Sequence, residues 1–391
     1  MELSCQQVLD VPSVTGDTST MRIVLDARFW RQATGGIGRY SRELTAELLQ
    51  LKTDDEFHII LTPKDEAEFY LKDSRITAHV VDIPHYSLSE QTRLPAFLNS
   101  LKPDLVHFLN FNQPIRYKGK RVTTIHDLTV KYFPVGRFQQ NPFRRAAFGV
   151  IMRTAANSHG VIAISRSTKA DIVGDLKVDP SNIRVIGEAA DRQFRLHSQQ
   201  ELTAFRKAEQ LEKPYILFVN QWRPHKGLPE LIAAFEALKR SGLPHQLIIT
   251  GKPSPLFPDI LTMIDRSAAR KDILTPGFVP DDKLPAYYSG AEVLAFPSYY
   301  EGFGLGVLEA MQSGTPVVCS EISSLPEVAG NAALFVAPKN VKQLTESLRA
   351  VLTQPQLASE LRTKGIAQAA RFSWERTAKE TYELYQNVVS I

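Results

Sequence analysis

Two glutamates flank a cluster of glycines in segment 297–318, PSYYEGFGLGVLEAMQSGTPVV. Glu301 precedes the first glycine, and Glu309 lies in a helical pattern that begins near Gly304 and Leu305. Because glycines have no Cβ atom, a ligand can approach their backbone closely, and a helix N-terminus offers unpaired N–H groups to phosphate. Carboxylates repel phosphate but accept hydrogen bonds from sugar hydroxyls. The segment therefore predicts a site for a ligand with both groups, such as a nucleotide diphosphate sugar.

A purely structural interpretation of these residues is that Glu309 is solvated on a helix surface and the glycines only form a turn. For an isolated pair of glutamates at this spacing, that interpretation is the better one. The apolar run before the glycines and the sequence GTPVV after the helix favour a ligand site.

A basic loop follows the apolar run YILFVN at residues 215–220. It contains Arg223, whose planar guanidinium can hold two phosphate oxygens, and Lys226, whose ammonium is a point charge. Both could neutralise a departing diphosphate. Two basic residues on a loop are more often merely solvated, but their position directly after a strand favours a function. The chain has no Asp-x-Asp triplet, so we expect no metal ion and no other cofactor.

The elements that must position these residues form two series of apolar runs and helical patterns. The first series has predicted strands at 21–27, 57–63, 104–110, 120–127, 160–165 and 183–189, and helices at 39–51, 91–102, 142–158 and 165–176. The second has predicted strands at 215–221, 246–252, 273–279, 292–298, 315–321 and 332–338, and helices at 228–242, 281–291, 304–313 and 341–354. This alternation predicts two α/β domains with parallel sheets, and a ligand cleft at the carboxyl ends of their strands.

Composition excludes several other classes of protein. The chain has 391 residues, 43% hydrophobic and 23% charged, which is typical of a soluble globular protein of two domains. Two distant cysteines, Cys5 and Cys319, exclude a disulfide framework and fit a reducing, cytoplasmic compartment. We expect no transmembrane span and no signal peptide. The formal net charge of +4 is too small to predict a nucleic-acid partner.

Basic residues concentrate in segment 116–153, which holds nine lysines and arginines but a single carboxylate, Asp127. Aromatic residues interleave with them, namely Tyr117, Tyr132, Phe133, Phe138, Phe143 and Phe148. Two interpretations stay open. The segment could meet an anionic membrane surface or an acceptor with a lipid diphosphate, or it could contain a buried helix with ordinary basic rims. The first interpretation predicts a peripheral location on the inner face of the membrane.

The segment from Glu301 to Glu309 and the following GTPVV resemble the E-x7-E signature of retaining GT-B glycosyltransferases of family four. One departure is Gly306, where members of the family often have proline. Further segments resemble the family's glycine-rich loop, His-Asp loop, basic pyrophosphate loop and the segment after the next strand: these are 35–40 (GGIGRY), His126-Asp127, 220–227 (NQWRPHKG) and 324–327 (SLPE). The resemblance covers nearly all of residues 21–390.

The resemblance implies a GT-B fold, which consists of two doubly wound Rossmann-like α/β domains with a cleft between them. We expect residues 21–195 to form an acceptor-binding domain and residues 196–371 a nucleotide-sugar-binding domain. The last helix, at 372–391, would cross back to the first domain. Residues 1–20 form a polar leader in this scheme.

Individual residues also acquire roles from the resemblance. We expect His126 and Glu301 at the reacting sugar, with His126 as a hydrogen-bonding positioner of the donor hexose. The segment 277–280 would hold the base through its backbone, and Gly36 would approach the acceptor and the donor phosphate. The full set of expected substrate-binding residues is Gly36, Arg223, Lys226, Phe278, Val279, Phe303, Gly304, Leu305 and Glu309.

The sequence thus predicts a metal-independent, retaining hexosyltransferase of polysaccharide biosynthesis. It would move glucose or mannose from a UDP- or GDP-hexose to a saccharide or lipid-linked saccharide acceptor. Two alternatives stay open. One is a phosphorylase or epimerase on the same fold, and the other is a non-catalytic membrane or nucleic-acid binder, which would leave Glu301, Arg223 and Lys226 without a role.

Overall fold

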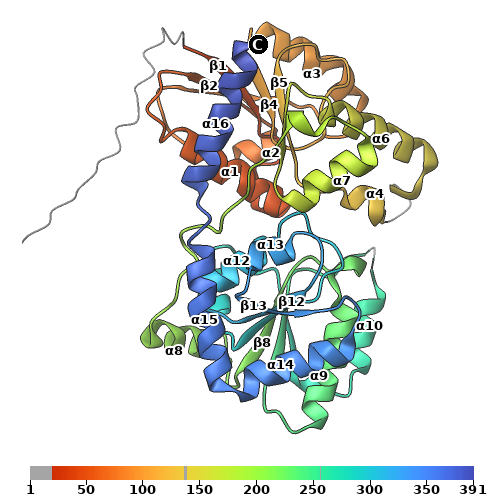
Figure 1. The fold of residues 1–391 in the computed structure, drawn as a ribbon, viewed down its shortest axis with the longest axis vertical. Coiled ribbons are helices and arrows are strands. Elements are labelled where there is room, and N and C mark those ends of the chain that lie inside the picture. The colour runs from red at the N-terminus through yellow and green to blue at the C-terminus, as the bar shows by residue number, and fades with distance from the viewer. Residues whose placement is uncertain (1–19, 136–138, 256) are drawn as a thin grey trace, which may run out of the picture.

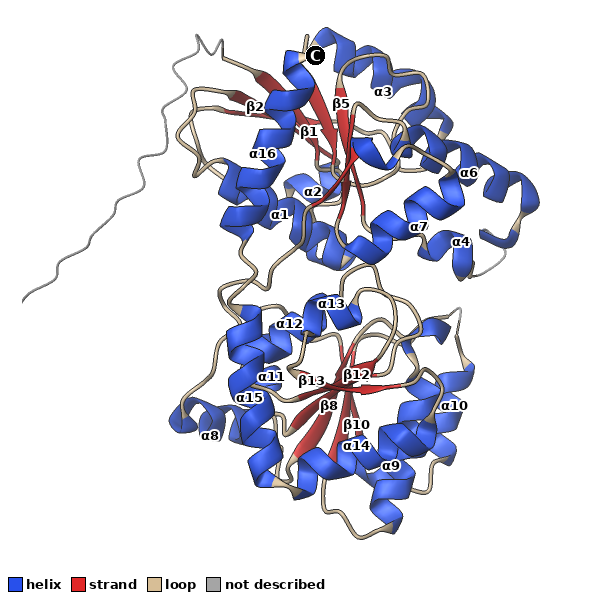
Figure 2. Cartoon of the chain, in the orientation of Figure 1, coloured by secondary structure: helices blue, strands red, loops and turns tan. Residues whose placement is uncertain are grey.

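The computed structural model describes residues 20–135, 139–255 and 257–391, which form two parallel sheets with helices on both faces (Figure 1, Figure 2). The first sheet has the strand order β3-β2-β1-β4-β5-β6-β7 and the second β10-β9-β8-β11-β12-β13. The first consists of β1 Arg22–Asp26, β2 Glu56–Leu61, β3 Ile76–Val80, β4 Leu105–Phe108, β5 Arg121–Ile125, β6 Gly160–Ala163 and β7 Ile183–Val185. The second consists of β8 Tyr215–Val219, β9 Gln246–Thr250, β10 Ile273–Gly277, β11 Val293–Phe296, β12 Val317–Ser320 and β13 Ala333–Val336.

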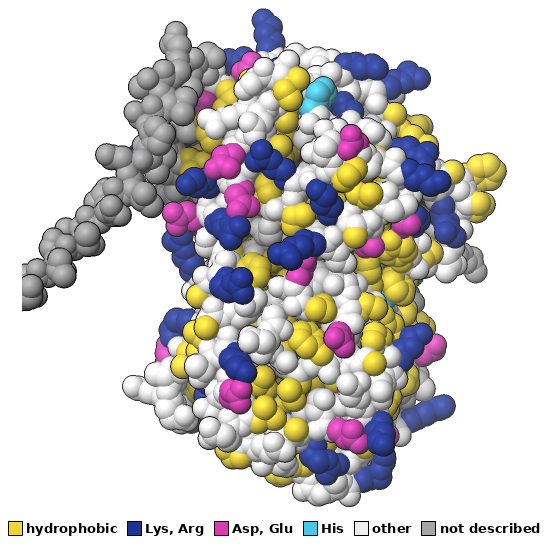
Figure 3. Space-filling view, viewed as in Figure 1, with side chains coloured by type: hydrophobic (Ala, Val, Ile, Leu, Met, Phe, Trp, Pro, Cys, Tyr) yellow, Lys and Arg dark blue, Asp and Glu magenta, His cyan; other side chains and the backbone are white. Residues whose placement is uncertain are grey.

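Helices connect successive strands and cover the sheets. Those of the first domain are α1 Gly36–Leu48, α2 Pro63–Glu66, α3 Leu88–Ser100, α4 Thr129–Tyr132, α6 Pro142–Ala156 and α7 Arg166–Leu176. The later ones are α8 Gln199–Ala208, α9 Leu228–Arg240, α10 Asp259–Arg266, α11 Leu284–Ser289, α12 Leu305–Gln312, α13 Leu325–Ala329, α14 Val341–Thr353, α15 Pro355–Ala369 and α16 Trp374–Ser390. In the part of the chain that the structure describes, no helix is long and apolar enough to cross a membrane. On the face drawn in Figure 3, hydrophobic side chains lie among basic and acidic ones.

The central strands explain why the sequence shows continuous apolar runs. Every residue of β4, β6, β11 and β12 is buried. A strand with helices on both faces cannot alternate between apolar and polar side chains, since neither face meets water. The prediction of two doubly wound α/β domains is therefore confirmed. Both sheets place the carboxyl ends of their strands toward the junction between the domains (Figure 2).

The last helix, α16, lies on the first domain although it follows the second in sequence (Figure 1). Its Tyr385 hydroxyl is 2.5 Å from His107 Nδ1 on β4, and its Tyr382 hydroxyl donates to Asp55 Oδ2 at 2.6 Å. The chain therefore passes between the domains twice, once after β7 and again before α16.

Several elements differ from the sequence-based expectations. The first helix begins at Gly36 rather than at residue 39, so Gly36 lies in a helical turn and not in a long loop. Residues 190–213, in which no helix or strand was predicted, contain α8, which begins with a capping box formed by Ser198 and Glu201. The edge strand β3 was missed because three of its five residues are exposed, which weakens its apolar pattern.

Parts of two predictions lie outside the described residues. These are residues 1–19 of the predicted polar leader and residues 136–138 of the basic segment.

Candidate active site

The glycine-rich loop between β11 and α12 contacts the first domain directly. A Cβ atom on Gly302 would lie 2.1 Å from the carbonyl oxygen of His126, so only glycine permits this approach. The Thr168 hydroxyl at the start of α7 lies 3.1 Å from the carbonyl oxygen of Gly302. The Tyr300 hydroxyl accepts from the Leu128 amide at 3.0 Å and donates to Asp171 at 2.8 Å. The loop thus joins the carboxyl ends of both sheets.

The N-terminus of α12 has no side-chain cap. Its N-cap residue is Gly304, which has φ +108°, a backbone conformation that strongly favours glycine. A Cβ atom at this position would also lie 2.7 Å from Leu325 Cδ2. Because no side chain occupies the cap, the first N–H groups of α12 remain available to an anion, and the helix dipole adds partial positive charge there.

Lys226 reaches the same loop from the other side. Its Nζ atom donates to both carboxylate oxygens of Glu301, at 2.8 and 2.9 Å, and both side chains are almost buried. Gly227, which follows Lys226, has φ +70°, and a Cβ there would lie 2.0 Å from the carbonyl oxygen of Pro297. The basic loop and the glycine-rich loop are therefore packed together. The lysine ammonium binds Glu301, which is three residues before Gly304, the N-cap of α12.

Arg223 lies on the same basic loop, at the start of the short 3-10 helix Pro224–Lys226. It is half-buried and has no ion-pair partner among the described residues. The intervening His225 is buried, and burial, reinforced by the charges of Lys226 and Arg223, lowers its pKa to about 3. His225 is therefore neutral, and the positive charge of the loop comes from Arg223 and Lys226.

Glu309 is buried in the second turn of α12 and is bound across the domain junction. It forms an ion pair with Arg39 of α1, and the Tyr288 hydroxyl donates to it at 2.8 Å. Arg39 also lies 3.3 Å from Asp281, which Arg42 contacts at the same distance. Glu309 was predicted at the site from the sequence, whereas Arg39 was not, although the GGIGRY segment contains it. The signal that could have identified Arg39 is its position directly after the glycines that begin α1.

The start of α1 faces the start of α12. A Cβ atom on Gly36 would lie 3.7 Å from Leu305 Cδ1, and Gly36 itself is exposed. Gly35, with φ +68°, lies against Gln221 of the basic loop, whose Nε2 would be 3.4 Å from an added Cβ. The structure thus brings together Gly36, Leu305 and the basic loop from three separate segments.

His126 lies at this junction, but both of its ring nitrogens are engaged. Nδ1 is 3.2 Å from Glu188 Oε1 and Nε2 is 2.9 Å from the carbonyl oxygen of Leu109. Burial opposes the charged form of the ring, but the hydrogen bond to Glu188 and its charge outweigh burial and raise the pKa of His126. Both nitrogens face acceptors, so the protonated ring donates twice. To contact a sugar, the ring must first release one of these partners.

Three other predicted residues differ in exposure. Phe278 is exposed, and the Lys252 ammonium lies 5.6 Å from the centre of its ring. Val279 is buried in the core of the second domain. The largely buried ring of Phe303 packs edge-on against Phe372 at 5.9 Å.

The Ser324 hydroxyl lies 2.7 Å from the carbonyl oxygen of Phe303 and so fixes the loop before α12. Among the described residues, no group of three or more His, Cys, Asp or Glu side chains could hold a metal ion.

The sequence matches two family models, one on each domain. Residues 34–194 match the model described as Glycosyltransferase Family 4, and residues 199–369 match the one described as Glycosyl transferases group 1. Together the two matches extend over most of the chain and include every predicted site residue.

Among curated proteins, the chain is similar to the O-antigen chain mannosyltransferase B of Escherichia coli. The two are 28% identical over 384 residues, which is 94% of this chain and all of that protein. The chain is also 25% identical to the serotype-specific mannosyltransferase WbdA of Escherichia coli over 82% of its own length, but it covers only 41% of WbdA.

Among solved structures, the chain resembles the sucrose-phosphate synthase of Thermosynechococcus elongatus. The TM-score is 0.77 at 22% identity, and the similarity covers 95% of this chain and 99% of that one. It also resembles HepE of Anabaena in complex with UDP and glucose, with a TM-score of 0.73, 17% identity and coverage of 93% and 98%.

Proposed function

Because this chain belongs to the group 1 glycosyltransferases of GT-B fold, we propose that it transfers a hexose from a nucleotide diphosphate sugar to a saccharide. The family and the fold agree with the resemblance found in the sequence. The proposal concerns the finer points, namely the donor, the acceptor, the stereochemistry and the residues that act.

One observation carries the assignment of the donor site. The Lys226–Glu301 ion pair lies next to the uncapped N-terminus of α12, and Arg223 lies on the same loop as Lys226. A diphosphate placed here would meet two cations and a helix dipole, which are the groups that stabilise negative charge on a leaving group. The same groups would stabilise the departing nucleoside diphosphate without a metal ion.

The contact between Lys226 and Glu301 suggests how the site changes when the donor binds. A phosphate oxygen competes with Glu301 for the lysine ammonium. Once released, the carboxylate of Glu301 is free to accept hydrogen bonds from hydroxyls of the donor hexose. Glu309 would do the same for the ribose, in competition with Arg39. The exposed start of α1 at Gly36 would adjoin the phosphates.

The transfer would retain the anomeric configuration. A front-face route, in which the departing phosphate oxygen takes the proton of the acceptor hydroxyl, needs no carboxylate nucleophile. Lys226 and the amides of α12 would stabilise the diphosphate as the bond to the sugar breaks. His126 would hold the loop that faces the hexose, since Glu188 and Leu109 occupy its ring nitrogens.

The names of the relatives favour mannose, so GDP-mannose comes first as donor and UDP-glucose second. We propose a saccharide or lipid-linked saccharide of polysaccharide biosynthesis as acceptor. The enzyme would act in the cytoplasm, in peripheral contact with the inner face of the membrane. Exposed Phe143 and the neighbouring arginines of α6 support this contact.

A panel of nucleotide sugars tests this function. GDP-mannose, UDP-glucose and their free nucleoside diphosphates are added to the protein, and thermal stability and slow donor hydrolysis are measured. At 100 times its Kd, a donor should raise the free energy of unfolding by about 2.7 kcal/mol, which shifts the melting temperature by a few degrees. Stabilisation and hydrolysis should follow the same donor. A protein that no member of the panel stabilises or that hydrolyses none would contradict the proposal.

A further inference from the structure

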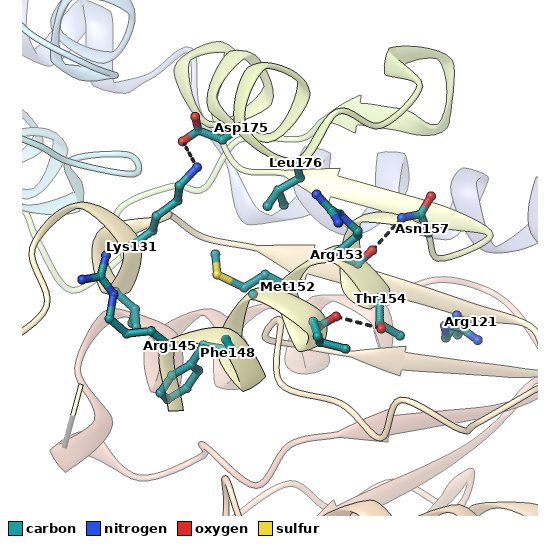
Figure 4. A pocket seen from close by; sticks show the side chains of 14 residues that line it. Arg121, Lys131, Arg145, Phe148, Met152, Arg153, Thr154, Asn157, Asp175 and Leu176 are labelled. Atoms are coloured by element: carbon teal, nitrogen blue, oxygen red, sulfur yellow. Dashed lines mark hydrogen bonds and ion pairs between the residues drawn. The ribbon is translucent and has the colours of Figure 1, made fainter. Parts of the chain in front are cut away.

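An open cavity lies on the first domain, between α4, α6 and α7 (Figure 4). Its volume is about 760 Å³. It does not include any residue of the proposed donor site. Most of the residues that line it belong to α6, and the others belong to α4 and α7, apart from Arg121 on β5 and Asn157 directly after α6. We call this cavity the α6 groove.

The middle of the α6 groove is apolar. Phe148, Met152 and Leu176 line it, and Figure 4 shows Met152 and Leu176 between the charged ends. Val150 on the same helix is 51% exposed. Phe148, Met152 and Leu176 are themselves nearly buried and form the floor of the groove, so the apolar surface that is open to water comes mainly from Val150. Covering such surface favours association with an apolar group, at roughly 25 cal/mol per Å². The groove is therefore suited to a hydrocarbon chain.

The ends of the groove are cationic. Arg145 and Arg153 are exposed on α6 and have no ion-pair partner among the described residues. Arg121 donates from Nη1 to the carbonyl oxygen of Tyr117, but its Nε is buried and lacks a hydrogen-bond partner among the described residues. The only carboxylate in the lining is Asp175, which pairs with Lys131 at 2.9 Å. Four cations against one carboxylate attract an anion.

The lining of the groove includes Arg145 and Arg153 on α6, and Lys131 precedes a tyrosine that contacts the loop of the proposed donor site. Arg145 and Arg153 are eight residues apart on α6, which corresponds to about 12 Å along the helix. Lys131 lies beside Arg145 at one end (Figure 4). The neighbouring Tyr132 packs edge-on against Tyr300 at 5.1 Å, and Tyr300 directly precedes Glu301. An anionic group at the Lys131 end would thus lie next to the loop that carries Glu301.

We propose that the α6 groove binds a single amphiphile with a hydrocarbon chain and a phosphate group, and that it holds the lipid part of the acceptor. The phosphate would contact Arg145 and Lys131, and the chain would lie along Val150, above the floor formed by Phe148, Met152 and Leu176. The sugar attached to the phosphate then extends toward Glu301. The role in acceptor binding rests on the proposed function, whereas binding of the amphiphile itself does not.

The test uses octyl phosphate below its micelle concentration, with inorganic phosphate and octanol as separate ligands, and measures binding by calorimetry. Octyl phosphate should bind the full chain saturably, and neither part alone should bind at the same concentrations. Replacing Arg145→Gln should weaken binding about five- to tenfold, since one charge-assisted contact is lost. Thermal unfolding should be unchanged, because Arg145 is exposed on a helix.

Arg144→Gln is the matched control. Arg144 is the neighbouring arginine on the same helix, it is also exposed, and it does not line the groove. Its replacement should change the affinity for octyl phosphate less than twofold. A diffuse basic surface that attracts a bilayer would lose as much with Arg144→Gln as with Arg145→Gln. Equal losses of affinity in the two variants, or no saturable binding of octyl phosphate by the unmodified chain, would overturn the proposal that the groove binds an amphiphile.

The same variants separate this inference from the proposed function. Arg145→Gln should bind GDP-mannose or UDP-glucose as the unmodified chain does, because the groove shares no residue with the donor site. If the chain binds octyl phosphate but no nucleotide sugar, the proposed function is refuted, and the proposal that the groove binds an amphiphile still holds. A chain that binds the donor but no octyl phosphate would refute only the groove.

Discussion

Replacing Lys226 with alanine should lower the rate of donor turnover by about 100- to 1,000-fold, the loss typical when one preorganised donor to a developing anion is removed. In the structure, the Lys226 ammonium is the partner of Glu301 and lies close to the start of α12. The variant removes the positive charge that would lie beside the leaving diphosphate. It also leaves the nearly buried Glu301 carboxylate without its cation. Steady-state hydrolysis of the preferred nucleotide sugar measures the effect.

Lys271→Ala provides the control for this prediction. Lys271 belongs to the same domain and is exposed, but it precedes β10, so it lies at the amino end of the second sheet, away from the site. Its removal should leave turnover unchanged. Arg223→Gln should lower turnover as well, though less, since Lys226 still neutralises the diphosphate. A Lys226→Ala protein that folds normally and retains the unmodified rate would remove the lysine from the mechanism.

Replacing Glu309 with glutamine should weaken donor binding about tenfold to 100-fold, with a smaller change in the rate of the bound complex. Glu309 is buried and is held by Arg39 and Tyr288 at the point where α1 and α12 meet. The amide of glutamine accepts weaker hydrogen bonds from ribose hydroxyls than the carboxylate does, and it no longer neutralises Arg39. The Kd for the donor, measured by calorimetry, reports the loss.

Arg39→Gln distinguishes a ligand-binding role of Glu309 from a structural one. If Glu309 binds the donor, freeing it from Arg39 should leave binding unchanged or strengthen it, because Arg39 competes with the ribose, whereas removing the charge of Glu309 weakens binding. If Glu309 only balances Arg39, both single variants and the double variant should have the same affinity. Equal affinities in all three would contradict the assignment of Glu309 to the ribose.

The fold could be predicted from the sequence because its strands are buried on both faces. Runs such as YILFV of β8 and VVCS of β12 are apolar without alternation, and each is followed by a helix. The signal failed where burial is partial. In β3 exposed and half-buried residues give no clear period, and in α8 none of the ten residues is buried. The capping box of α8 was present in the sequence but lay in a stretch with few apolar residues.

The candidate site could be predicted where one segment contains all its parts, as in the loop from Glu301 to the start of α12. Contacts between distant segments could not be read from the sequence. The pairing of Arg39 with Glu309 joins residues 270 positions apart, and the packing of Gly302 on the His126 carbonyl depends on the docking of two domains. Neither of these two contacts produces a periodic pattern in the sequence.

The hydrogen-bond partners of His126 could not be predicted from the sequence either. Glu188 and the Leu109 carbonyl come from different loops and meet the ring only in the folded protein. The predicted contact of His126 with the donor hexose stays a prediction, and in this structure both of its ring nitrogens have partners within the protein. The raised pKa of the ring, which burial opposes and Glu188 favours, likewise depends on contacts that form only in the folded protein.

The position of the diphosphate decides the central claim. A crystal structure of the chain with GDP or UDP should place one phosphate within about 3 Å of Lys226 Nζ and of the amides at the start of α12, with Arg223 at the other phosphate. Glu301 should then have moved off the lysine. A nucleotide bound with Lys226 still on Glu301, and with Arg223 and α12 turned to other surfaces, would contradict the account.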